Sequence, residues 1–97
     1  MTVARHLVIR GRVQGVGYRA FVEDAALDHG LAGWVRNRRG GAVEAVFAGS
    51  SAAIDAVVQA CRRGPPGARV DSVDEREATA EELALGVGVR FAVLPTV

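Results

Sequence analysis

The sequence contains no lysine, and all 12 of its basic residues are arginines. This absence excludes catalysis by a lysine amine. It also excludes a nucleotide-binding P-loop, whose lysine contacts the phosphates. The arginines are balanced by 11 acidic residues, so the net charge is only +1. A protein that wraps nucleic acid needs a basic stripe, and this balance argues against nucleic acid as a partner.

Cysteines and long apolar runs are also scarce. Cys61 is the only cysteine, which excludes an intrachain disulfide and a cysteine-rich metal site. No run of 18 apolar residues is present, and the N-terminus lacks the charged-then-apolar pattern of a signal peptide. We therefore expect a protein of the reducing cytoplasm with no membrane partner. Residues 1–97 are predicted to form a single domain with one modest core.

Hydrophobic periodicity predicts strands and two helices in the order β-α-β-β-α-β, with a possible split of the final strand into two segments. Strands are expected at 3–10, 31–38 and 42–48, and a last strand is expected at 89–94. The extended polar segment 70–79 is predicted to be an edge strand. The helices are expected at 18–29 and from Ser50 or Ser51 to the break at Gly64. The segment 80–88 fits neither pattern clearly. Right-handed crossovers then predict a ferredoxin-like α+β sandwich, an antiparallel sheet with both helices on one face.

Some side chains receive a structural interpretation from this pattern. Leu7 and Ile9 share one face of the first strand, and His6 lies on the other. Glu44 and the acidic residues between 71 and 82 are predicted to form a solvated edge. Surface or packing positions, and no catalytic role, are predicted for four further residues: His6, His29, Trp34 and Cys61.

A glycine-punctuated segment joins the first strand to the first helix: Gly11-Arg12-Val13-Gln14-Gly15-Val16-Gly17-Tyr18-Arg19. Glycine permits positive φ and lets a ligand approach the backbone closely. The N-terminus of a helix offers unpaired N–H groups and a partial positive charge. Arg19, in the first helical turn, adds a planar guanidinium that can contact two phosphate oxygens. The segment therefore indicates an anion-binding cradle.

Two alternatives to anion binding stay open at this point. The glycines can simply serve a tight strand-to-helix turn, and Arg19 can be a solvated surface residue. A cation in the first helical turn, however, is unfavourable with respect to the helix dipole by up to about 1 kcal/mol. An anion bound between Arg19 and the amides would remove that cost.

Asn37 lies near the end of the second predicted strand, although asparagine has poor β propensity. It can begin the turn that contains Gly40 and Gly41, or its amide can orient a water or a substrate oxygen beside the cradle. A dinucleotide site would need an acidic residue at this strand end. The chain has Arg36, Asn37 and Arg38 there, which argues against a dinucleotide site.

Together these motifs resemble the acylphosphatase family. The matching segments are 11–19, then Gly30-Leu31-Ala32-Gly33-Trp34-Val35-Arg36-Asn37, Gly41-Ala42-Val43-Glu44 and Gly64-Pro65-Pro66-Gly67-Ala68-Arg69-Val70, and a last strand with Phe91 and Val93. They cover essentially the whole chain, and two separated signature blocks at the proper spacing make the match specific. The family usually has Asp-Gly in the hairpin where this chain has Gly40-Gly41. This change affects the rigidity of the turn and leaves the matched site residues in place.

The resemblance implies an enzyme that hydrolyses the carboxyl–phosphate bond of acyl phosphates to a carboxylate and inorganic phosphate, without a metal or other cofactor. By this match, Arg19 is the phosphate-binding arginine and Asn37 positions the attacking water. The amides of the family's phosphate-binding loop correspond to Gln14, Gly15, Val16, Gly17 and Tyr18. Inorganic phosphate or sulfate is expected to compete with the substrate, and the enzyme is expected to be a monomer.

Two functions of other classes are alternatives to an enzyme. A binding module that holds acyl or carbamoyl phosphate without turnover would use the same cradle, but the length of the chain and the presence of both Arg19 and Asn37 favour catalysis. RNA binding on a ferredoxin-like sheet needs stacking aromatic side chains on the open face. The chain has five aromatic residues, two of them expected in the core, which disfavours RNA.

Overall fold

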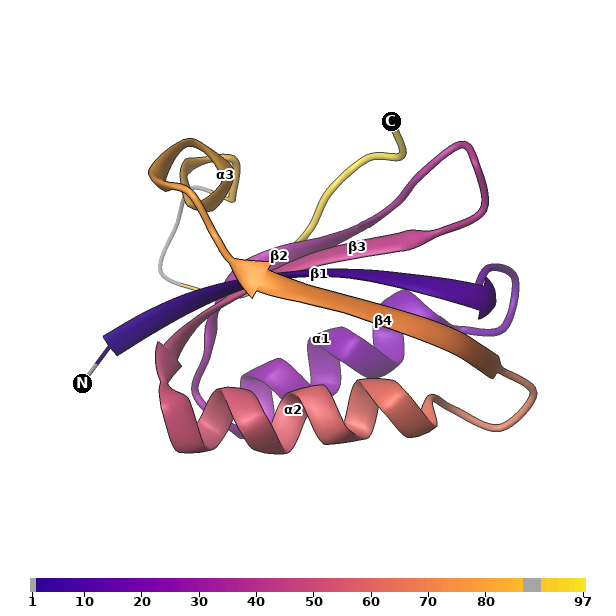
Figure 1. The fold of residues 1–97 in the computed structure, drawn as a ribbon, viewed down its shortest axis with the longest axis horizontal. Helices are drawn as coiled ribbons and strands as arrows, with labels where there is room; N and C mark the ends of the chain where they lie inside the picture. The colour runs from indigo at the N-terminus through magenta and orange to yellow at the C-terminus, as the bar shows by residue number, and fades with distance from the viewer. Residues whose placement is uncertain (1, 87–89) are drawn as a thin grey trace.

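The computed structural model describes residues 2–86 and 90–97. The elements follow in the order β1 (Thr2–Arg12), α1 (Tyr18–Asp28), β2 (Ala32–Asn37), β3 (Val43–Ser50), α2 (Ser51–Arg63), β4 (Arg69–Glu77), α3 (Ala80–Ala84) and β5 (Ala92–Val93). Helices α1 and α2 lie together on one face of the sheet, and the short α3 lies on the opposite face (Figure 1). This is the predicted α+β sandwich, with α3 added within the segment that the sequence left ambiguous.

Four strands are antiparallel neighbours in the order β4-β1-β3-β2, which confirms the ferredoxin-like plan. The polar strand β4 lies at one edge, as predicted. The sheet is nevertheless mixed, because β5 pairs with β2 in parallel, with Val35 opposite Val93. After β4 the chain passes to the far edge of the sheet, where β5 lies beside β2. Strands β4 and β2 point in opposite directions, so β5, which reverses the direction of β4, runs parallel to β2. Of the predicted last strand, Val89 lies outside the described residues.

Local sequence signals explain where the helices end and begin. After α1, the amide of Gly30 donates to the carbonyl of Leu27 at 3.1 Å and the amide of Leu31 donates to that of Ala26 at 2.9 Å, a Schellman arrangement. At the start of α2, the Ser50 hydroxyl accepts from the amide of Ala53 at 3.2 Å, which confirms Ser50 as the cap. Both junctions are set by residues within one turn of the helix end.

The core lies between the sheet and the two long helices. Leu7 and Ile9 are both fully buried there, as the alternation in β1 predicts. The helices contribute stripes at helical spacing, and their fully or nearly fully buried members are Tyr18, Val22, Ala26, Ile54, Val57, Val58 and Cys61. Removing each large apolar side chain from water stabilises the fold by roughly 1.5–3 kcal/mol. The core therefore holds the start of α1 firmly against the sheet.

The opposite face carries His6, Trp34 and Glu44, and one of these predictions was wrong. Glu44 was expected on a solvated edge, but only 6% of it is exposed. It lies in β3 between β1 and β2, opposite Val8 and Arg36. The alternation of apolar and polar residues in β3 correctly places Glu44 on the face away from the core. That pattern gives no sign that other groups, α3 among them, lie over this face. Trp34 is fully buried and donates from Nε1 to the backbone carbonyl of Glu82 in α3 at 2.7 Å, so its role is packing.

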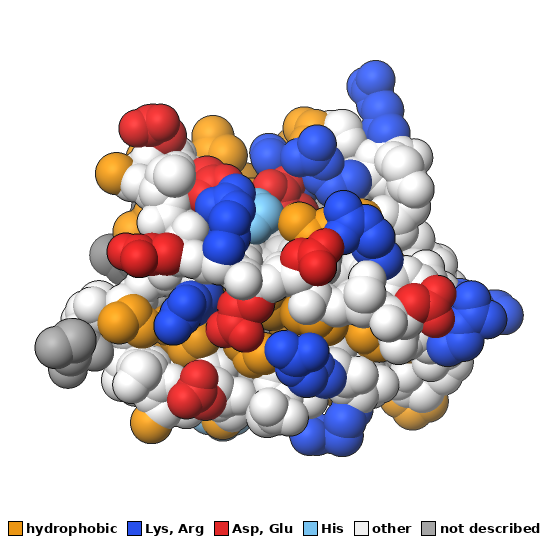
Figure 2. Space-filling model, viewed as in Figure 1, with side chains coloured by type: hydrophobic (Ala, Val, Ile, Leu, Met, Phe, Trp, Pro, Cys, Tyr) orange, Lys and Arg blue, Asp and Glu red, His pale blue; other side chains and the backbone are white. Residues whose placement is uncertain are grey.

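Charged side chains of both signs are interspersed over the face of the molecule drawn in Figure 2. Arginines stand beside acidic groups in pairs, such as Arg10 with Asp74 and Arg69 with Asp71 on the edge of the sheet. Such pairs at an exposed surface contribute little to stability. They do cancel the local field, which agrees with the small net charge.

Candidate active site

The loop between β1 and α1 leaves a set of backbone amides without partners. Gly15 and Gly17 both have φ of +76°, and Gly17 is the N-cap of α1. This left-handed conformation suits glycine, and a glycine cap has no side chain that could accept hydrogen bonds from the first amides of the helix. Within the described residues, no backbone carbonyl accepts from the amides of residues 14–17. The first turn of α1 also contains no acidic residue.

Arg19 follows two residues after the N-cap and lines a cavity in front of this loop. Its guanidinium forms no ion pair with any residue that the structure describes. The loop and Arg19, whose amides and guanidinium have no partner among the described residues, thus line one cavity. The positive end of a helix together with a guanidinium is an arrangement suited to a phosphate.

Asn37 reaches the same cavity from the last residue of β2. Its partner in β3 is the core residue Val43, so both side chains lie on the helix-covered face of the sheet. The side-chain oxygen Oδ1 of Asn37 is buried and accepts no hydrogen bond in the described part of the chain. Buried polar atoms almost always have a partner. This unpaired acceptor therefore indicates a position for a water or a ligand donor.

The side chain of Gln14 ties the loop to the β2–β3 turn. Its Nε2 donates to the backbone carbonyl of Arg38 at 2.7 Å and to that of Ala42 at 2.9 Å. These carbonyls flank the turn that follows Asn37. The family resemblance implies only a backbone role for Gln14, but its side chain also joins the loop to the turn that follows Asn37.

The cavity has a volume of about 350 Å³. It is lined by Val13, Gln14, Gly15, Gly17, Tyr18, Arg19, Ala20, Glu23, Asn37 and Val93. It thus brings together six of the seven predicted site residues. Val16 is the exception: it does not line the cavity, and its side chain packs against the core.

Two residues with distinctive side chains line the cavity and were missed by the sequence analysis. Glu23 lies four residues after Arg19, and that spacing puts both on one face of α1, so helical periodicity was an available signal. Val93 comes from β5, at the other end of the chain, and no local pattern connects it with the loop.

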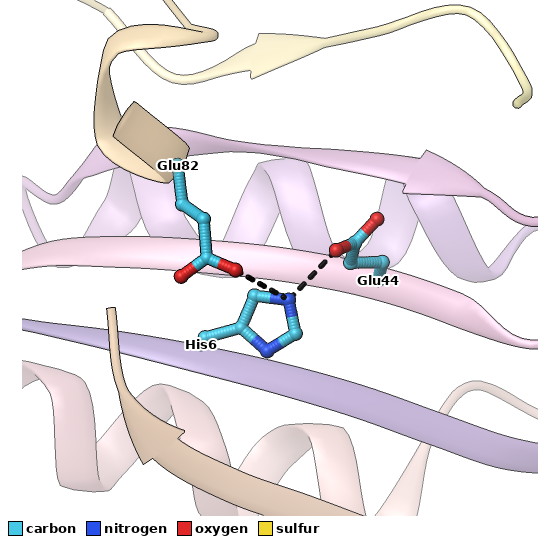
Figure 3. Close-up of side chains that lie close together, drawn as sticks. All are labelled: His6, Glu44 and Glu82. Carbon is cyan, nitrogen blue, oxygen red and sulfur yellow. Dashed lines mark hydrogen bonds and ion pairs between the residues drawn. The ribbon is translucent and has the colours of Figure 1, made fainter. Parts of the chain in front are cut away.

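A second group of chemically active side chains lies on the open face, under α3. His6 from β1, Glu44 from β3 and Glu82 from α3 point toward one another (Figure 3). The Nε2 atom of His6 lies 2.7 Å from Oε2 of Glu44 and 3.6 Å from Oε2 of Glu82. One ligand atom from each residue falls within 4.8 Å of the others, which is a spacing that a metal ion can bridge.

The surrounding charges do not suit a metal ion. Glu44 Oε1 accepts from Arg36 at 2.8 Å and from Arg38 at 3.0 Å. Both carboxylate oxygens of Glu82 accept from Arg76, at 2.8 and 2.6 Å. A divalent cation would thus share the site with three guanidinium groups. We interpret the cluster as an ion network that fastens α3 to the sheet.

The network shifts the titration of both carboxyl groups. Burial by itself would raise the pKa of Glu44, but the hydrogen bonds from His6, Arg36 and Arg38 together lower this pKa below its ordinary value. The hydrogen bonds from Arg76 and from the backbone of Thr79 lower the pKa of Glu82 to about 2. Both groups are therefore ionised at neutral pH.

Other candidates for acid–base or nucleophilic chemistry lie elsewhere. Neither His6 nor His29 lines the cavity, and the ring of His29 is hydrogen-bonded through Nδ1 to the carbonyl of Ala25 at 2.9 Å. Cys61 is fully buried, and burial raises the pKa of its thiol to about 12. A protonated, inaccessible thiol cannot act as a nucleophile. None of the helices described is long and apolar enough to cross a membrane.

The chain is similar to known proteins over nearly its whole length. The profile of a family described as acylphosphatase matches residues 5–91. An acylphosphatase of Bradyrhizobium diazoefficiens is 59% identical over 92 residues, which are 94% of this chain and 93% of the relative. The solved structure of an acylphosphatase from Coxiella burnetii covers 96% of this chain and 93% of its own, with a TM-score of 0.83 and 32% identity. Full-length HypF, crystallised in a phosphate- and nucleotide-bound form, is similar over 99% of this chain but only 12% of its own, with a TM-score of 0.83 and 28% identity.

Proposed function

The chain belongs to the acylphosphatase family and hydrolyses acyl phosphates, and from this premise we propose that Arg19 and the loop amides bind the phosphate while Asn37 positions the attacking water. The single observation that carries the proposal is the shared cavity. Within the described part of the chain, the loop with its unpaired amides, Arg19 with its unpaired guanidinium and Asn37 with its unpaired Oδ1 all line this cavity.

The substrate phosphoryl group lies at the N-terminus of α1 in this mechanism. Amides from the segment 14–18 donate to its oxygens, and Arg19 contacts two of them through its planar guanidinium. Charge on the equatorial oxygens is thereby stabilised as the transition state forms, which is the main requirement of phosphoryl transfer. The backbone donors are held in place by the fold before the substrate enters, so little reorganisation is needed.

The water is held by Asn37. Its Oδ1 accepts a hydrogen bond from the water and directs the water oxygen toward phosphorus. A bond forms between the water oxygen and phosphorus while the bond between phosphorus and the acyl oxygen breaks, and the carboxylate leaves with the electron pair. A phosphate oxygen of the substrate accepts the proton of the water. The leaving carboxylate is stable as an anion and needs no protein acid.

Three further features belong to the same proposal. No step in it requires a metal or another cofactor. Inorganic phosphate or sulfate competes with the substrate, because either anion fits the same donors. The protein acts as a monomer in the cytoplasm, since one chain supplies the amides, Arg19 and Asn37, and its one thiol is free and buried.

Arg19 provides the test of the phosphate site. With benzoyl phosphate as substrate and excess chelator present, Arg19→Ala should lose turnover by at least about a hundredfold and should also lose inhibition by inorganic phosphate. Arg19→Lys should recover little of either, because an ammonium cannot reproduce the bidentate fork. The control is Arg63→Ala, which removes an exposed arginine at the end of α2. Chelator-sensitive turnover, or phosphate inhibition that persists in Arg19→Ala, would contradict the proposal.

A further inference from the structure

The lining of the cavity includes residues that the proposed phosphate site does not use. One of them is Glu23, which lies one helical turn after Arg19 in α1. Another is Val93 of the edge strand β5, a strand that contacts α1. Val93 is opposite Val35 in the parallel pair, so its side chain lies on the helix-covered face with that of Asn37. We call this part of the cavity the Glu23–Val93 end.

The two side chains at this end present a distinctive combination. Val93 is 43% exposed, although most large apolar side chains of the described chain are buried. An exposed valine in a cavity wall offers an apolar contact to a bound molecule. Glu23 forms no ion pair with any described residue, and the neighbouring cation Arg19, one turn earlier on the same face of α1, binds the phosphate in the proposed mechanism. Glu23 therefore disfavours a second anionic group at this end.

We propose that the Glu23–Val93 end receives the acyl group and selects neutral, apolar acyl phosphates over those whose acyl group carries a second negative charge. The inference rests on the proposed function, because it requires the phosphate to occupy the Arg19 end. With the phosphoryl group held there, the remainder of the substrate has to extend along the cavity or into solvent. Val93 then contacts an apolar acyl group, and Glu23 repels a carboxylate.

Three substrates separate these contributions: benzoyl phosphate has a neutral apolar acyl group, acetyl phosphate has a small one, and succinyl phosphate carries an extra carboxylate. The measurement is kcat/KM for each substrate with the whole chain. The wild-type enzyme should prefer benzoyl phosphate to succinyl phosphate by about tenfold or more. Equal values for these two substrates would overturn the proposal.

The Val93→Ser variant tests the apolar contact. It should lower kcat/KM for benzoyl phosphate by about tenfold and that for acetyl phosphate by about twofold or less, because the small acyl group makes little contact. The matched control is Leu85→Ser, which changes another exposed large apolar residue away from the cavity. An equal loss for both substrates would mean that Val93 acts on the fold and not on the acyl group.

The Glu23→Gln variant tests the charge. It should raise kcat/KM for succinyl phosphate by roughly five- to tenfold and leave that for benzoyl phosphate within about twofold. Asp24→Asn is the matched control, because it removes one negative charge from the adjacent exposed position of α1. If Glu23→Gln abolished turnover of all three substrates, Glu23 would be a catalytic residue and the proposed selection would be wrong.

The outcome of the Arg19→Ala experiment separates this inference from the proposed function. Suppose that Arg19→Ala loses turnover and phosphate inhibition, while the Val93 and Glu23 variants keep the wild-type preference among acyl groups. This result would overturn only the acyl-group selection. Normal phosphate inhibition in Arg19→Ala would overturn the phosphate site itself.

Discussion

The hydroxyl of Tyr18 donates a 2.5 Å hydrogen bond to the backbone carbonyl of Cys61, and both residues are buried. Tyr18 is the first residue of α1, and Cys61 lies in the last turn of α2. The last carbonyls of a helix have no intrahelical donor, so the phenol satisfies a group that would otherwise be unpaired. Burial raises the pKa of Tyr18 above its ordinary value, which keeps the hydroxyl protonated as a donor. The contact fixes the point from which Arg19 projects.

Tyr18→Phe should lower the free energy of unfolding by about 1–2 kcal/mol, because a buried carbonyl loses its donor while the ring still fills the core. The measurement is urea denaturation of the two proteins. We also expect kcat/KM to fall several-fold for every acyl phosphate, since the start of α1 becomes less constrained. Unchanged stability would show that the carbonyl of Cys61 finds another partner.

Asn37→Ala should lower kcat by about a hundredfold, because one preorganised contact to the attacking water is lost. The inhibition constant for inorganic phosphate should change by about twofold or less, since the donors to phosphate are elsewhere. Steady-state kinetics with phosphate as a competitive inhibitor gives both values. A parallel loss of phosphate binding would assign Asn37 to the anion site and not to the water.

The network of His6, Glu44 and Glu82 should make stability sensitive to acid. The folded state lowers the pKa of both carboxyl groups, Glu82 to about 2, relative to about 4.3 in an unfolded chain. The folded state therefore binds fewer protons in this range. Its extra stability is present above about pH 5 and is lost as the pH falls toward 2. Urea denaturation between pH 7 and pH 2 measures this loss.

Glu44→Gln provides the matching variant. It should lower the free energy of unfolding by about 3 kcal/mol at pH 7, because it leaves a nearly buried ion network with one partner removed. The stability of this variant should also depend less on pH below 5. The exposed Glu81→Gln in α3 is the control and should behave as wild type. An acid profile of Glu44→Gln that matches wild type would place the acid sensitivity elsewhere.

Gly33 allows a close approach of β2 to β3. A Cβ atom at this position would overlap the backbone carbonyl oxygen of Val46, and the residue has φ of +126°. Gly33→Ala should therefore destabilise the fold by about 2–3 kcal/mol. Gly40→Ala is the control, because nothing lies within 4 Å of its Cβ position and its φ is not positive. Thermal or urea denaturation that ranked the two variants equally would contradict this explanation.

Much of the site was accessible from the sequence because its determinants are local. The glycines of the loop, the start of α1 at Tyr18 and the position of Arg19 follow from residues close to one another in the chain. Asn37 was placed at a strand end by the same kind of pattern. The roles of these residues came from the family resemblance, and they stay proposals until the variants are measured.

Contacts between distant segments were not accessible in this way. Glu44 was predicted to be solvated, because alternation in β3 shows which face it lies on and not what covers that face. The meeting of Val93 with the loop depends on β5 joining the edge of the sheet beside β2. The hydrogen bond between Tyr18 and Cys61 joins residues 43 positions apart.

The chain alone thus specifies the order of its two long helices and its strands, the glycine at the start of α1 and the presence of a guanidinium beside it. These properties depend on backbone conformation and side-chain periodicity over a few residues. Only the folded molecule establishes that Asn37, Glu23 and Val93 share a cavity with Arg19 and that Glu44 is buried beside His6, Arg36 and Arg38. The reason is that strand order and the packing of helices on each face of the sheet bring distant residues together, and neither is written in any short segment.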